Sequence, residues 1–108
     1  KIDKTFFCSD EKECRILLSH NPDSVDTKFN TPLSLVLSGH THGGQVVVPF
    51  FCPPVLPVKN KNYSSGLIAT PKTQLFISRG IGWSIYPIRF NCYPEIAILE
   101  LVNPKLVA

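Results

Sequence analysis

Three histidines, His20, His40 and His42, are the side chains of this sequence best suited to chemistry. The first ends the run "ILLSH", and the other two lie two residues apart in "LVLSGHTHGGQ". Imidazole is the commonest side-chain metal ligand, and it binds without losing a proton at neutral pH. A single histidine after a strand is also often an ordinary loop residue. Three histidines in such positions indicate a metal site, whose metal the spacing does not identify.

The two apolar runs that precede these histidines, residues 15–20 and 33–40, are predicted to form buried strands. If both strands lie parallel in one sheet, their carboxyl ends meet at the same edge, where open α/β sheets bind ligands. The three imidazoles would then converge on one pocket. Glycines on both sides of the pair (Gly39, Gly43 and Gly44) allow the bend that points both histidines inward.

The whole chain, residues 1–108, is predicted to form a strand-rich α/β domain. After the first strand we expect a turn and a short helix within 21–29, capped by Asp23 or Ser24. Further expected elements are a third strand at 44–50, a proline-rich loop at 50–66, a hairpin of 66–70 with 73–80, an irregular aromatic segment at 81–92 and a final strand at 94–102.

Charge and cysteine content exclude several functions. The net charge is only +3 and the lysines and arginines are scattered, which argues against nucleic-acid binding. The four cysteines (Cys8, Cys14, Cys52 and Cys92) form no C-x-x-C pair, so a zinc ribbon is not expected. Free thiols in a reducing compartment are favoured, with a Cys8–Cys14 disulfide as the alternative. No methionine, leader or bilayer-spanning run is present, and we expect the chain to begin inside a longer protein.

Three stretches resemble the calcineurin-like metallophosphoesterases. "GHTHGGQ" (39–45) resembles their final G-H-x-H motif, and "LLSHNPD" (17–23) resembles the motif before it. "LFISRGIGWSIYPIRFNCYPEIAILEL" (75–101) is similar to the closing segment of the bacterial subgroup that includes YkuE- and YaeI-like phosphoesterases. The resemblance covers residues 15–101 in the order that the family has.

The resemblance implies the C-terminal half of a four-layer αββα sandwich with two divalent metals, either manganese, iron or zinc. His20 and His40 would bind one metal and His42 the other. A hydroxide between the metals would attack phosphorus. Gly43 and Gly44 would leave room for the phosphoryl group. The implied substrate is a phosphodiester or pyrophosphate, and the subgroup includes enzymes that act on lipid-linked nucleotide sugars of lipid A synthesis.

The family's acidic motifs, D-x-H, G-D-x-x-D and G-N-H-D/E, are absent from this sequence. "DSVD" (23–26) is interpreted as the start of a helix. The remaining metal ligands and the general-acid histidine are therefore expected upstream, in an N-terminal half of the same protein, and this chain alone is expected to be inactive. The alternative is a non-catalytic module that binds a metal or a partner.

Four further side chains (Arg79, Gln45, Trp83 and Tyr86) have two interpretations each, and a fifth, Arg89, has one. Arg79 could hold a phosphate through its guanidinium or form a structural ion pair. Gln45 could face the site, although a role at the start of a strand is favoured. Arg89 is expected at the surface. Trp83 and Tyr86 could line the cleft, although a place in the core is favoured.

The apolar loop "FFCPPVLP" (50–57) could contact a lipid tail or a membrane surface, or it could pack against the N-terminal half. The expected location is cytoplasmic, including a peripheral position on the inner face of a bacterial membrane.

Overall fold

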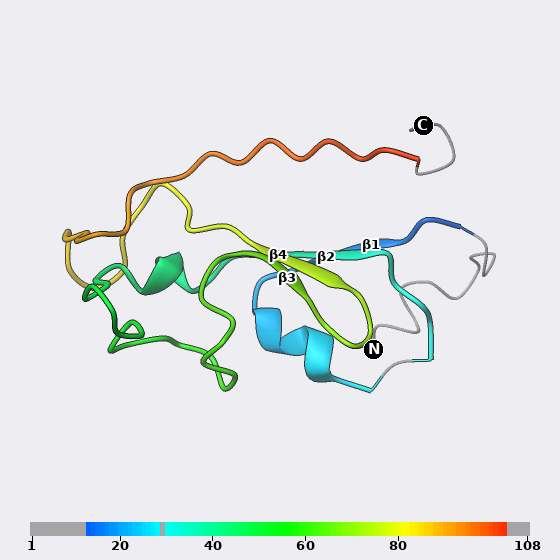
Figure 1. Cartoon of the computed structure of the whole chain (residues 1–108), viewed down its shortest axis with the longest axis horizontal. Coiled ribbons are helices and arrows are strands. Elements are labelled where there is room, and N and C mark those ends of the chain that lie inside the picture. Colours follow the sequence, from blue (N-terminus) through cyan, green and yellow to red (C-terminus); the bar gives the residue numbers. More distant parts are fainter. Residues whose placement is uncertain (1–12, 29, 104–108) are drawn as a thin grey trace.

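The computed structural model describes residues 13–28 and 30–103, which form one mixed four-stranded sheet (Figure 1). The strands are β1 (Ile16–Ser19), β2 (Leu35–Ser38), β3 (Gly66–Ala69) and β4 (Gln74–Ile77), in the order β1-β2-β4-β3. The first two strands pair in parallel, β2 also pairs in parallel with β4, and β3 and β4 form an antiparallel hairpin. The predicted parallel strands and hairpin are confirmed.

The register of the sheet brings the ends of β1 and β2 together. Ser19 pairs with Ser38, so that both strands end at the same level. His20 and Gly39 are the residues that follow, and the Gly39 amide donates to the His20 carbonyl over 3.4 Å. The sheet therefore positions the two predicted histidine turns side by side.

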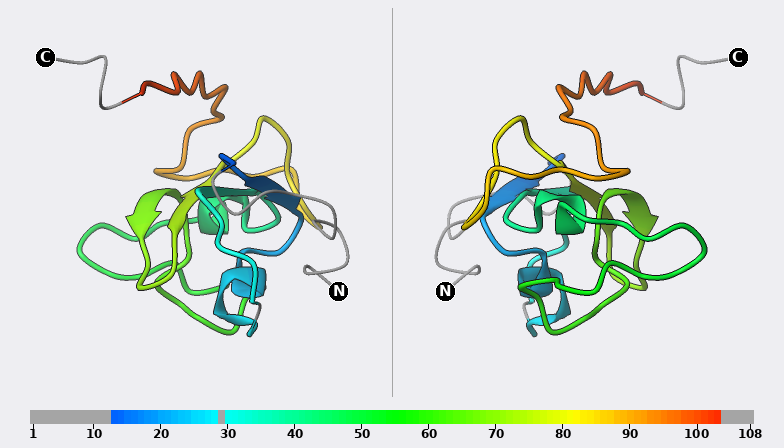
Figure 2. Two further views of the ribbon diagram at one scale, coloured as in Figure 1. Left: turned by 90° about the vertical axis from the view of Figure 1, so that its right-hand side faces the viewer. Right: turned by 90° about the vertical axis from the view of Figure 1, so that its left-hand side faces the viewer.

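One face of the sheet is covered by a single 3-10 turn, η1 (Pro22–Asp26), as Figure 2 shows from two sides. Asn21 caps this turn, because its side chain accepts from the Asp23 amide over 2.9 Å, and the prediction of Asp23 or Ser24 as the cap is wrong. Pro22 has a fixed φ suited to the first helical position, so the turn begins there. The core between η1 and the sheet comprises Val25, Leu33, Val36, Tyr63, Leu75 and Ile77.

The strand predicted at 44–50 does not form. Only one parallel bridge, Val46 with Phe90, is present. A short turn, η2 (His42–Gly44), precedes it, and both Gly44 and Gln45 have positive φ, at 85° and 56°. Three successive valines favour a strand locally, but the backbone bends just before them and again at Pro49–Phe50.

The strand predicted at 94–102 is also absent. This segment runs past the open face of the sheet, opposite η1, and makes no ladder with β1–β4 (Figure 1). Its large apolar side chains are exposed, with Ile96 at 85% and Ile98 at 93%. Apolar alternation predicts which residues can line a sheet, but a strand needs a neighbour, and none pairs with this segment among the described residues.

The described residues thus form an α/β arrangement of one small sheet, and the four-layer sandwich and the domain limits remain predictions. No helix within 13–28 and 30–103 has the length and apolarity needed to span a bilayer.

Candidate functional site

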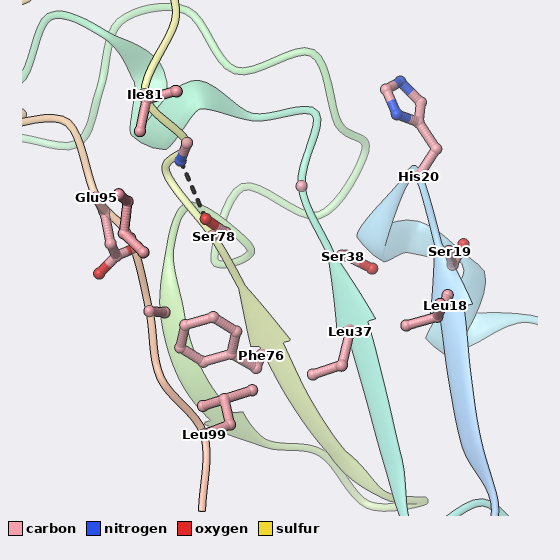
Figure 3. Close-up of a pocket in the computed structure, with 14 residues that line it drawn as sticks. Leu18, Ser19, His20, Leu37, Ser38, Phe76, Ser78, Ile81, Glu95 and Leu99 are labelled. Atoms are coloured by element: carbon pink, nitrogen blue, oxygen red, sulfur yellow. Dashed lines mark hydrogen bonds between the residues drawn. The ribbon is translucent and has the colours of Figure 1, made fainter.

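His20 and His40 lie together at the carboxyl edge of the sheet. Their ring centroids are 4.4 Å apart, and the rings are tilted by 50°. Figure 3 shows His20 directly beyond the end of β1, beside a cavity lined by Leu37, Phe76 and Leu99. The predicted convergence of the two turns is confirmed for this pair.

His42 does not join the pair in a three-ligand cluster. Across residues 13–28 and 30–103, no three His, Cys, Asp or Glu side chains lie close enough together to hold a metal. The ring of His42 instead lines a second cavity, which it shares with His40. Its Nδ1 atom is buried and has no hydrogen-bond partner in the described chain. A buried ring nitrogen without a hydrogen-bond partner destabilises the fold, unless a ligand serves as its partner.

The turn that carries His40 and His42 is made by the histidines themselves. Both have left-handed φ angles, 71° and 51°, whereas Gly39 does not. Such conformations cost about 1–3 kcal/mol for a residue other than glycine and are enriched at functional sites, although Gln45, Phe50, Ile85 and Asn91 also have positive φ. Gly43 and Gly44, at 63° and 85°, complete the bend as predicted.

Thr41, between the two histidines, anchors the turn and was not singled out from the sequence. It is 2% exposed, and its hydroxyl donates to the Ser64 carbonyl over 2.7 Å. The same oxygen accepts from the Gly43 amide over 3.2 Å. The sequence could have indicated this role, because a threonine two residues before a glycine in a tight turn can accept a hydrogen bond from the glycine amide through its hydroxyl.

The hydrogen bond of His40 selects one of its ring tautomers. Its Nε2 atom lies 3.1 Å from the Pro57 carbonyl oxygen, which can only accept. The proton must therefore be on Nε2, which leaves the lone pair of Nδ1 for a metal. A metal-binding histidine normally donates its second ring N–H to a carbonyl or carboxylate in this way. The imidazoles thus fit a divalent metal, although the described residues supply only part of a ligand set.

Arg89, which was expected at the surface, is half-buried, and its guanidinium is held by structural contacts. Its guanidinium donates to five backbone carbonyls in two loops. The acceptors are Gly82 at 2.7 Å, Arg79 at 2.7 Å, Cys92 at 3.2 Å, His42 at 3.3 Å and Gly80 at 3.3 Å. Its alternation with apolar neighbours indicated exposure, but the folded loops surround the charge with acceptors. Arg89 thereby fixes the backbone of a candidate metal ligand.

Gln45 holds the segment 84–88 against the histidine turn. Its Nε2 donates to the carbonyls of Tyr86 and Ile88 over 3.4 and 3.3 Å, and its Oε1 accepts from the Ser84 amide. The interpretation of Gln45 as the first residue of a strand is wrong, because its φ is 56° and no strand follows.

Arg79 forms the structural ion pair, the second of its two interpretations. Its Nη2 lies 3.4 Å from Glu95 Oε1, and its backbone amide donates to Glu95 Oε2 over 3.0 Å. A role in substrate binding remains a prediction.

Close packing accounts for the two glycines after His42. A Cβ on Gly43 would lie 2.6 Å from Cys92 Sγ and 2.7 Å from Arg79 Cγ, and one on Gly44 would lie 2.9 Å from Pro53 Cγ. The chain's own side chains therefore fill this space, and contact of Gly43 or Gly44 with a phosphoryl group stays a prediction.

Trp83 and Tyr86 are 58% and 68% exposed, so the interpretation as core residues is wrong. Tyr86 lines the second cavity. Most of the loop 50–57 is also exposed, with Phe50 and Phe51 at 104% and 73%, whereas Leu56 is buried. Free thiols are confirmed for Cys14, Cys52 and Cys92, whereas Cys8 lies outside the described residues.

Comparison with known proteins places these features in a family. The chain is 47% identical over 88 residues to phosphodiesterase YaeI of Escherichia coli (strain K12), a match that covers 82% of this chain and 32% of YaeI. It is 42% identical over 86 residues to the uncharacterized metallophosphoesterase YkuE of Bacillus subtilis (strain 168), covering 80% of this chain and 30% of YkuE.

A third relative, UDP-2,3-diacylglucosamine pyrophosphatase LpxG of Chlamydia muridarum, is 36% identical over 94 residues, covering 79% of this chain and 28% of LpxG. No family model and no solved structure matches the chain. The chain spans about a third of the length of these relatives. By these matches, the chain is homologous to part of the bacterial metallophosphoesterases that include YaeI and YkuE.

Proposed function

We propose that this chain is the C-terminal part of a metal-dependent phosphohydrolase that cleaves phosphodiester or pyrophosphate bonds. The observation that carries the proposal is the pair of adjacent imidazoles, His20 and His40, at the ends of two parallel strands. The buried, unpartnered Nδ1 of His42 on the following turn supports it. The relatives named as a phosphodiesterase and as a pyrophosphatase support the same reaction class.

His20 and His40 would hold one divalent ion, and His42 would hold a second. Manganese, iron and zinc all accept imidazole nitrogen. Such ions supply an activated water and neutralise charge on the phosphoryl oxygens. The carboxylate ligands and the general acid would come from the part of the protein that precedes this chain.

The residues around the histidines would hold them in position. The Pro57 carbonyl fixes the tautomer of His40, and the hydroxyl of Thr41 anchors the turn. Arg89 fixes the carbonyl of His42. These contacts would keep the ring nitrogens in place as substrate binds, which is how such sites reach the geometry that catalysis needs.

Among phosphorylated substrates, a lipid-linked nucleotide diphosphate is the candidate suggested by the relative named as a UDP-2,3-diacylglucosamine pyrophosphatase. A simple phosphodiester is the candidate suggested by the relative named as a phosphodiesterase. We place the protein in the cytoplasm, where a lipid-linked substrate would bring it to the inner face of the membrane.

Manganese-dependent hydrolysis of bis-p-nitrophenyl phosphate by the full-length protein tests the proposal. His40→Ala and His42→Ala should each lower kcat/KM by about 100-fold or more, since a lost ligand exceeds the 10–100-fold effect of an outer contact. Lys59→Ala, at an exposed site, is the matched control. Wild-type activity in both histidine variants would contradict the proposal.

The alternative, a non-catalytic metal- or partner-binding module, is favoured by one observation, the incomplete ligand set among the described residues. It predicts that the full-length protein hydrolyses no phosphoester, whatever metal is added. Metal content measured by atomic emission, together with the hydrolysis assay, separates the two functions.

A further inference from the structure

We propose that the cavity beside His40 and His42 binds an apolar group esterified to the substrate's phosphate. This inference rests on the proposed function and specifies the substrate class of the same site. The cavity has a volume of about 500 Å³, within the range of pockets that bind small molecules. Both His40 and His42 line it, whereas His20 lines the other cavity.

The lining of this cavity is polar at His40, Thr41, His42, Gln45 and Ser84 and otherwise largely apolar. Two segments supply most of it, the proline-rich loop and the residues held by Gln45. The apolar lining residues are Val46, Pro54, Val55, Pro57, Ile85, Tyr86 and Ile88. Several of these side chains are largely exposed, with Val55 at 71% and Ile85 at 83%. Exposed apolar side chains that converge on a cavity gain free energy when a ligand covers them.

No Asp, Glu, Lys or Arg side chain is among the described residues that line the cavity. Away from the two histidines, a charged or strongly polar group would lose its hydration without gaining an ionic partner. An alkyl or aromatic group loses nothing on entry. The composition of the walls therefore selects an apolar ester group over a charged one.

The cavity is also built before any ligand arrives. Gln45 holds the backbone of 84–88 through three hydrogen bonds, and the Phe90 amide donates to the Gln45 carbonyl over 2.8 Å. The opposite wall contains prolines, whose φ is fixed. Because Gln45 follows His42 by three residues, the same turn sets both the histidine ring and the wall. A phosphate held at the histidines would thus have its ester group directed along this wall.

The test is a series of p-nitrophenyl alkyl phosphates, from methyl to octyl, hydrolysed by the full-length manganese-loaded protein. Burial of each methylene should raise kcat/KM by up to about fourfold, until the cavity is filled. Binding of the non-reactive dialkyl phosphates, measured by calorimetry, should show the same dependence on chain length without catalysis.

Two substitutions should flatten this dependence, Val55→Asn and Ile85→Asn. In Ile85→Asn, the asparagine tolerates the φ of 66° at this position. Val48→Asn is the matched control, because Val48 lies just before the loop that contains Val55 and is exposed but lines neither cavity. It should retain the slope of the wild-type protein.

The outcomes separate this inference from the proposed function. Hydrolysis of bis-p-nitrophenyl phosphate with no dependence on alkyl length would overturn the cavity assignment alone. No hydrolysis of any ester would overturn the proposed function. A lowered unfolding temperature in Val55→Asn and Ile85→Asn, with an unchanged slope, would show that the protein itself fills the cavity and would also overturn the assignment.

Discussion

The imidazole rings of His20 and His40 lie with their centroids 4.4 Å apart, although one follows β1 and the other follows β2. Two rings at this separation can serve the same metal ion. If they do, the loss of either one removes most of the affinity, and the loss of both adds little more.

We therefore expect His20→Ala and His40→Ala each to weaken Co²⁺ binding to the full-length protein by roughly 100-fold. The double variant should bind no more than a few-fold worse than either single variant. The visible absorption of bound Co²⁺ in a titration measures this. Fully multiplicative effects in the double variant would mean that the two rings act at independent sites.

Thr41 should be needed for its hydroxyl rather than for its size. Thr41→Val keeps the shape but leaves the Ser64 carbonyl and the Gly43 amide without their buried partner, which costs about 1–3 kcal/mol. Thr41→Ser keeps the hydroxyl and should cost about 1 kcal/mol at most. Urea unfolding of both variants gives the comparison, and equal losses would show that the methyl group matters more.

Arg89 should not be replaceable by lysine. An ammonium group is a point charge and cannot reach five carbonyls in two loops, so Arg89→Lys should destabilise by about 2–3 kcal/mol. Arg79→Lys is the matched control. Its ion pair with Glu95 is partly exposed, and its loss should cost under about 1 kcal/mol. Chemical denaturation measures both, and a fully stable Arg89→Lys protein would refute a role in fixing the loops.

Gly43 should tolerate no side chain. Gly43→Ala would place a methyl group against Cys92 and Arg79 at a φ of 63°, so we expect a loss of about 2 kcal/mol or more. Gly82→Ala, where nothing lies within 4 Å and φ is not positive, is the control. Thermal unfolding distinguishes them. Normal stability of Gly43→Ala with lost activity would instead support contact with the substrate.

Tyr63 links stability to high pH. Burial raises the pKa of its hydroxyl above 10.0, and the hydrogen bond to Asp26, at 2.8 Å, acts in the same direction. The protonated form is therefore favoured in the folded state. Its contribution is complete below pH 10.0 and is lost as the pH rises through the raised value.

Tyr63→Phe should cost about 1 kcal/mol at neutral pH, and the difference in unfolding free energy from the wild-type protein should shrink as the pH rises above 10.0. Urea unfolding of both proteins across this pH range measures the difference in their unfolding free energies. Groups that titrate equally in both proteins do not contribute to this difference. A difference that stays constant with pH would contradict the assignment.

The sequence allowed the sheet and the histidine pair to be predicted because both depend on local pattern. Apolar runs bounded by turn residues identified β1 to β4, and parallel pairing of β1 with β2 was enough to bring His20 and His40 together. The valines at 46–48 carried the same local pattern, but the positive φ values of Gly44 and Gln45 overrode it.

The supporting residues could not be predicted, since their partners are distant in sequence. Arg89 bonds to the carbonyl of His42, and Gln45 bonds to the segment 84–88, only after two loops have folded together. The residues next to Arg89, an isoleucine and a phenylalanine, do not indicate that its guanidinium will donate to five backbone carbonyls. The strand pattern of 94–102 failed for the opposite reason, since its side chains alternate correctly but no partner strand is present among the described residues.

The three hydrogen bonds of Gln45 also make the histidine turn and the loop at 84–88 a single mechanical unit. A ligand that displaces the backbone of Tyr86 or Ile88 would strain the hydrogen bonds to Gln45. Gln45 is joined to His42 through Gly43 and Gly44, so the displacement would also move the backbone of His42. Under the proposed function, a ligand that fits the cavity poorly would therefore also shift the His42 ring away from the position in which it would bind a metal.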